Sequence, residues 1–67
     1  MSTMYRKINQ LVGSGQRYGQ ACFNALYEYY PDLANEIAGS DVDPFYVEDE
    51  CDPLFARFWA YVLTRMI

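Results

Sequence analysis

Apolar residues recur at helical spacing in four stretches of the chain. In the first stretch the repeat runs from Met4 to Val12 and stops at two closely spaced glycines, Gly13 and Gly15. An i, i+3, i+4, i+7 repeat is typical of a helix with one buried face, and glycine after the last repeat commonly ends a helix. The pattern therefore predicts a short first helix that ends at this turn.

The second and third stretches predict two more helices that a proline separates. The second helix is expected over about residues 16–29, with Ser14 as its N-cap. Gly19 weakens that helix by about 1 kcal/mol relative to Ala but permits the close approach of another helix. Pro31 ends the second helix, because the residue before a proline is biased out of the α region, and it opens a third helix that Gly39 closes.

The most regular pattern lies at the C-terminal end. Asp52-Pro53 pairs an N-cap acceptor with a residue whose missing N–H costs nothing at the first helical position. The apolar face expected for this last helix consists of Phe55, Phe58, Trp59, Val62, Leu63 and Met66. A similar pair, Asp43-Pro44, predicts a single helical turn over the two aromatic residues that follow it.

The predicted fold is all-α, a small bundle of three or four short helices in a single helical domain, 1–67, with an acidic loop before the C-terminal helix. No alternating run predicts a strand, and no repeat or linker divides the chain. A chain of 67 residues has a small core, yet this one carries seven Tyr, four Phe and one Trp. Surplus aromatic surface favours a homo-oligomer or a partner. The alternative is that tyrosines lie half exposed with their hydroxyls in water.

Charge is segregated along the chain. All nine acidic residues lie between Glu28 and Asp52, and all five basic residues lie outside that segment. Asp32, Asp43 and Asp52 stand at predicted helix starts, where a negative charge is stabilising, so the remaining acids concentrate around residues 41–50. The chain has a net charge of -4 and lacks the basic stripe that direct binding of nucleic acid requires. Its acidic segment favours a partner with a basic surface.

Little in the sequence supports catalysis or a cofactor, and neither is predicted. There is no His, Cys22 and Cys51 have no basic neighbour in sequence, and residues 13–15 lack the Lys of a nucleotide-binding loop. The two cysteines are either free thiols or a single bridge. The N-terminus has no secretory signal, and no apolar run is long enough to span a bilayer, so a cytoplasmic protein without a membrane role is expected.

The acidic segment resembles a calcium-binding loop only in part. Asp41, Asp43 and Asp52 occupy positions 1, 3 and 12 of a twelve-residue loop, but Tyr46 stands where the sharp turn requires Gly. A carboxylate-based enzyme or a weak metal site therefore ranks third among the functional alternatives. The oxygen ligands of such a weak site would come from Asp41, Asp43, Glu48 and Asp49.

Residues 19–46 carry the pattern GQAxFNxL followed by PxLAxxIxGSDxDPFY. This pattern resembles one found in small uncharacterised proteins of phages and prophages. The resemblance implies a phage-encoded protein that acts in the cytoplasm of the host cell by binding and redirecting a host protein, and it implies no catalytic role. A structural explanation of the same residues makes Phe45 and Tyr46 a plug that folds the acidic segment onto the core.

The first functional hypothesis is a non-enzymatic interaction protein that docks on a basic surface of a host protein through an acidic loop, residues 41–52, and exposed tyrosines. The alternative is a DNA mimic, whose carboxylates imitate phosphates and block a nucleic-acid-binding protein. The candidate partner-binding residues are Asp41, Asp43, Phe45, Tyr46, Glu48, Asp49, Glu50 and Tyr61.

Overall fold

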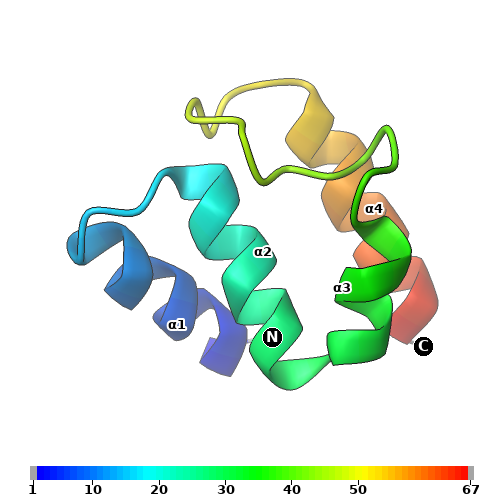
Figure 1. Cartoon of the computed structure of the whole chain (residues 1–67), viewed down its shortest axis with the longest axis horizontal. Coiled ribbons are helices and arrows are strands. Elements are labelled where there is room, and N and C mark those ends of the chain that lie inside the picture. Colours follow the sequence, from blue (N-terminus) through cyan, green and yellow to red (C-terminus); the bar gives the residue numbers. More distant parts are fainter. Residues whose placement is uncertain (1, 67) are drawn as a thin grey trace.

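The computed structural model describes residues 2–66 and contains four helices in that part of the chain. They are α1 (Ser2–Gly13), α2 (Tyr18–Tyr29), α3 (Pro31–Ile37) and α4 (Leu54–Met66). No strand occurs within these residues, and the acidic loop, residues 41–52, lies between α3 and α4 (Figure 1). The prediction of an all-α bundle with this loop before its last helix is confirmed.

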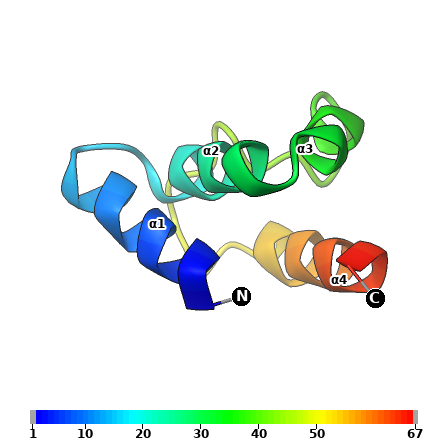
Figure 2. The same ribbon diagram turned by 90° about the horizontal axis from the view of Figure 1, so that it is seen from below.

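The helices form two layers. In Figure 1, α1 lies along one side of α2, and α3 follows the C-terminal end of α2. Figure 2 shows α2 and α3 in one layer and α4 in a second layer below α3. Large aromatic side chains connect the layers. The ring of Tyr18 on α2 meets Phe55 on α4 with a centroid distance of 4.8 Å, and Tyr5 on α1 lies 5.4 Å from Trp59. The final helix therefore packs through its rings against both α1 and α2.

The core is built from one side of each helix, as the periodicity predicts. Phe58 is fully buried and meets its neighbour Trp59 edge-on at 4.9 Å. Leu63 was expected on the same apolar face but is 45% exposed, because α4 faces the core along the line of residues 55, 58 and 62. The side chain of Met66 lies outside the described part. The buried apolar residues are Met4, Ile8, Ala21, Cys22, Ala25, Leu26, Leu33, Ala34, Ile37, Phe55, Phe58 and Val62.

The start of α2 differs from the sequence prediction. Ser14 does not cap it, because its hydroxyl donates to the carbonyl oxygen of Gln10 at 3.0 Å and so closes the end of α1 instead. The N-cap position is occupied by Arg17, which makes no side-chain capping hydrogen bond. The helix consequently begins at Tyr18, two residues later than expected.

The two Asp-Pro pairs have different outcomes. Asp52 caps α4 as predicted, since its Oδ1 accepts the backbone N–H of Leu54 at 2.9 Å. A single turn over Phe45 and Tyr46 follows Asp43, as predicted, since the N–H of Val47 donates to the carbonyl oxygen of Pro44 at 2.9 Å, but no helix continues from it. Among the described residues, no helix has both the length and the apolar character needed to cross a membrane.

Candidate interaction surface

The acidic loop is docked on the N-terminal end of α2 (Figure 1). The backbone N–H of Gly19 donates to the carbonyl oxygen of Val47 at 2.8 Å, and Pro44 beside it is fully buried. A Cβ on Gly19 would stand 1.8 Å from the carbonyl oxygen of Pro44, a distance that no packing tolerates. The close approach expected at Gly19 therefore occurs, but the approaching segment is the loop and not a second helix.

Two aspartates hold the loop in shape from within. Asp43 accepts the N–H of Gly39 on Oδ2 at 2.9 Å and the N–H of Phe45 on Oδ1 at 3.0 Å. Asp49 accepts the N–H of Cys51 at 2.9 Å. An aspartate that binds the backbone two residues on forms an Asx turn, which fixes the local chain direction. Asp43 and Asp49 therefore have a structural role whatever they bind.

The two adjacent aromatics of the loop have different environments. Phe45 is half-buried and meets Phe23 on α2 edge-on, with a centroid distance of 5.6 Å. Tyr46 is 82% exposed, although its ring lies only 5.0 Å from that of Phe45. Of the expected aromatic plug, Phe45 folds onto the helix layer and Tyr46 stays in solvent.

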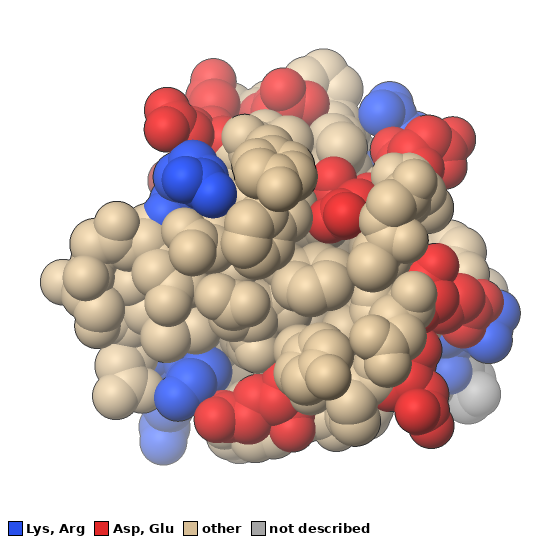
Figure 3. Space-filling model, in the orientation of Figure 1, with Lys and Arg blue, Asp and Glu red and all other residues tan. Residues whose placement is uncertain are grey.

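The acids that follow Tyr46 form one wall of a hollow. Glu48, Asp49 and Glu50 are exposed and line one side of this hollow, which has a volume of about 510 Å³. Its other lining residues are Val12 and residues 15–18. In Figure 3 the acidic side chains gather along the upper edge of the molecule, over the loop, and along its right edge, whereas the left end is largely uncharged. Asp41 is also exposed, at the start of the loop. The loop thus presents a carboxylate-rich rim beside an exposed tyrosine.

Tyr61 belongs to a different contact. Its hydroxyl donates to Oε1 of Glu36 at 2.5 Å, and Nη1 of Arg65 lies 2.7 Å from the same oxygen. The hydrogen bond to Glu36 raises the pKa of Tyr61 above its usual value. These contacts join α4 to α3, whereas Phe45 of the acidic loop contacts Phe23 on α2. The polar contacts of Tyr61 are therefore with α3 and not with the acidic loop.

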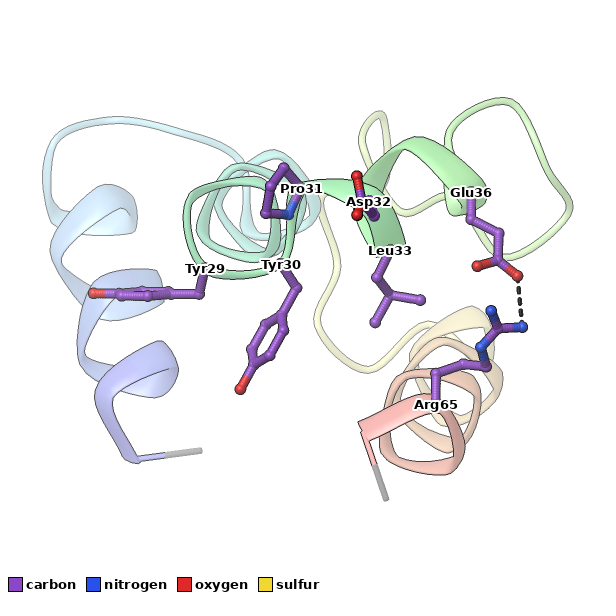
Figure 4. A pocket seen from close by; sticks show the side chains of 7 residues that line it. All are labelled: Tyr29, Tyr30, Pro31, Asp32, Leu33, Glu36 and Arg65. Atoms are coloured by element: carbon purple, nitrogen blue, oxygen red, sulfur yellow. Dashed lines mark ion pairs between the residues drawn. The ribbon is translucent and has the colours of Figure 1, made fainter.

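A second hollow, which the sequence did not indicate, lies between α3 and α4. It has a volume of about 470 Å³ and is lined by residues 29–33, Glu36 and Arg65. Figure 4 shows Tyr30 and Leu33 extending into the space between the helices, with the ion pair of Glu36 and Arg65 at one end. The Tyr-Tyr-Pro run that joins α2 to α3 indicates a helix boundary in the sequence but no hollow.

Both cysteines are free thiols, so the possible bridge is not formed. Cys22 is buried on α2, and burial raises the pKa of its thiol from 9.0 to about 12. Burial likewise raises the pKa of the adjacent Tyr18 to about 12. A protonated, covered thiol is a poor nucleophile. Cys51, in contrast, is exposed on the acidic loop.

The described part of the structure shows no feature that favours metal binding. Within residues 2–66 no group of three or more His, Cys, Asp or Glu side chains is arranged to hold a metal ion. Two of the four carboxylates considered for a weak site, Asp43 and Asp49, already accept backbone N–H groups.

Comparison of the chain with protein-family models, curated proteins and solved structures finds no significant match. The resemblance to small phage and prophage proteins stays a prediction. The geometry of the acidic loop is therefore the basis for assigning a function.

Proposed function

We propose that the chain is a non-enzymatic interaction protein that binds a basic surface of another protein through its acidic loop, with Tyr46 as the central anchor. The observation that carries this proposal is the 82% exposure of Tyr46 on a loop whose backbone is fixed to α2 at Gly19 and Val47. Tyrosine combines a large contact area with little conformational entropy to lose, which makes it a common anchor in interfaces.

The surrounding carboxylates determine the kind of partner. Glu48, Asp49 and Glu50 are exposed beside the anchor, and none of them forms an ion pair with a described Lys or Arg side chain of this chain. Unpaired surface charges of one sign steer a partner of opposite sign and select against partners of the same sign. A partner patch rich in Lys and Arg is the surface that this loop fits.

The biological setting in this proposal rests on the resemblance of residues 19–46 to small phage and prophage proteins. A phage-encoded protein of this size would act in the host cytoplasm on a host protein. Under this proposal, the candidate residues that contact the partner are Asp41, Tyr46, Glu48, Asp49 and Glu50. Asp43 and Phe45 support the loop from beneath, and Tyr61 joins α4 to α3.

An affinity experiment tests this assignment. The chain and a Tyr46→Ala variant are immobilised and exposed to a bacterial lysate, and mass spectrometry identifies proteins retained by the first but not by the second. Truncation of an interface anchor typically costs more than about 2 kcal/mol, which is a loss of roughly 30-fold in affinity. Equal retention by both chains of every bound protein would contradict the role of Tyr46.

Once the partner has been purified, a competition experiment distinguishes the DNA-mimic alternative from the proposed interaction. A mimic occupies the groove that DNA occupies, so duplex DNA should displace the chain, and its affinity should fall steeply with added salt. Formation of a ternary complex with DNA would exclude mimicry and leave the proposed interaction in place.

A further inference from the structure

Arg17 stands at a position that disfavours a cation. It occupies the N-cap of α2 and makes no capping hydrogen bond from its side chain. The N-terminus of a helix carries partial positive charge, so a cation there is destabilising. Its Nε atom is buried and has no hydrogen-bond partner in the described part of the chain, which adds a desolvation cost. The stability of α2 therefore does not explain this residue.

Ion pairing with the acidic loop does not explain Arg17 either. Arg17 lines the same hollow as Glu48, Asp49 and Glu50, yet the ion pairs among the described side chains are Lys7 with Glu28 and Arg65 with Glu36. The guanidinium group lies instead beside the two aromatic rings of the loop. Its Cζ atom is 5.7 Å from the ring centroid of Phe45 and 5.8 Å from that of Tyr46.

These two distances are within the range of cation–π attraction. A guanidinium group about 6 Å or less from a ring centroid is attracted to the ring, and its planar shape also allows stacking. Phe45 is already held from below by Phe23. Tyr46, which is 82% exposed, receives a contact from Arg17, which lies at the N-cap of α2 and outside the acidic loop.

We infer that Arg17 is a positioning residue for the proposed interface, because its guanidinium group fixes the ring of Tyr46 in its exposed orientation before a partner binds. This inference rests on the proposed function of Tyr46 as an anchor. Fixing a side chain in its bound orientation removes part of the entropy cost of association, so the benefit is to affinity and not to folding. The unfavourable cation at the N-cap and the unsatisfied Nε of Arg17 are then explained by its role in positioning Tyr46.

Nuclear magnetic resonance relaxation of the Tyr46 ring tests the role directly. Arg17→Met keeps the apolar stem and removes the guanidinium group, while Arg17→Lys keeps the charge and removes the planar fork. Arg57→Met is the control, because Arg57 is an exposed cation on α4 and its loss gives the same net charge. We expect a lower order parameter for the Tyr46 ring in Arg17→Met, an intermediate value in Arg17→Lys and the native value in Arg57→Met.

Thermal unfolding of each variant accompanies the relaxation measurement. If Arg17→Met does not fold, the comparison of Arg17→Lys with the native chain decides, because the inference predicts a looser Tyr46 ring there as well. A Tyr46 ring that is as ordered in the folded Arg17 variants as in the native chain would overturn the inference.

A binding measurement separates this inference from the proposed function. The probe is a fluorescein-labelled octa-arginine peptide at low salt. Arg17→Met and Arg57→Met have the same net charge, so a charge effect alone predicts equal affinities, or tighter binding by Arg17→Met, whose lost cation lies beside the loop acids. Positioning predicts that Arg17→Met binds roughly two- to five-fold more weakly, the ratio that corresponds to an exposed cation–π contact.

Equal or tighter binding by Arg17→Met would also contradict the inference. Failure of the native chain to bind the peptide would count against the proposed function, and the relaxation of the Tyr46 ring would still decide the role of Arg17.

Discussion

At the scale of single residues, Gly19 controls whether the acidic loop can dock. Alanine is favoured over glycine inside a helix by about 1 kcal/mol, so helix propensity alone predicts that Gly19→Ala stabilises the protein. The added Cβ would collide with the carbonyl oxygen of Pro44, at 1.8 Å, and with that of Val47, at 2.4 Å. Because these are backbone atoms, relief requires the loop to move, and such overpacking costs about 1–3 kcal/mol.

We therefore expect Gly19→Ala to lower the free energy of unfolding measured with urea and to shift the amide resonances of residues 45–47. Gly13→Ala is the matched control, since a Cβ there meets no atom within 4 Å and the position is helical. It should leave stability unchanged or raise it by up to about 1 kcal/mol. Native stability and native loop resonances in Gly19→Ala would show that the loop is not docked as described.

The two cysteines should differ strongly in reactivity. Cys22 is fully buried and its pKa is raised to about 12, so at about pH 8 it is both covered and protonated. Cys51 is exposed. A thiol reagent should modify Cys51 rapidly in the native protein and Cys22 only after unfolding in urea, as located by peptide mapping. Rapid native labelling of Cys22 would contradict its burial.

At the scale of secondary structure, the start of α4 depends on one side chain. Asp52 Oδ1 accepts the N–H of Leu54, and loss of an N-cap acceptor typically costs about 1 kcal/mol. Asp52→Ala should show this loss in urea unfolding, while Asp52→Asn, which keeps an acceptor, should lose less. Both variants lose the same charge, so their difference isolates the hydrogen bond. Equal stability of the two variants would show that the hydrogen bond from Leu54 to Asp52 does not stabilise α4.

The four helices were predictable because each carries its own periodic pattern, and the first three also have a stop signal. Gly39, for example, adopts a φ of 78° after α3, the left-handed conformation for which glycine is suited. The details that failed depend on competing partners. Ser14 binds backwards to Gln10 and does not cap α2, and no helix follows the turn after Asp43, although Asp43 accepts the N–H two residues on as Asp52 does. These side-chain contacts are local, but the periodicity of apolar residues does not show which of the nearby backbone groups a polar side chain binds.

At the scale of the whole molecule, the sequence located the acidic loop but could not predict its orientation. Phe45 and Tyr46 are equivalent in a pattern of apolar residues, and only docking on α2 covers one and exposes the other. The same docking depends on Gly19, which lies 28 positions before Val47 in the chain. Arg17 was missed for the same reason, since its contact with Tyr46 joins distant segments.

The charge of the acidic loop can be reversed without removing its internal hydrogen bonds. Glu48 and Glu50 are exposed and make none of the hydrogen bonds that hold the loop, whereas Asp49 accepts the N–H of Cys51. Reversal of the two glutamates therefore changes the charge of the rim without removing a support of the loop. Glu28→Lys/Asp32→Lys is the control, because it changes the net charge equally on the exposed ends of α2 and α3. It breaks the surface ion pair with Lys7 and reverses the charge of Asp32 in the first turn of α3, each of which costs about 1 kcal/mol or less.

The most direct measurement is the calorimetric affinity of these two double variants for the partner that the Tyr46-dependent capture identifies. The account predicts that Glu48→Lys/Glu50→Lys abolishes binding while its thermal midpoint stays near the native value, and that the control binds at close to native affinity. Equal affinities for the two variants would show that net charge and not the acidic loop attracts the partner, and would contradict the account.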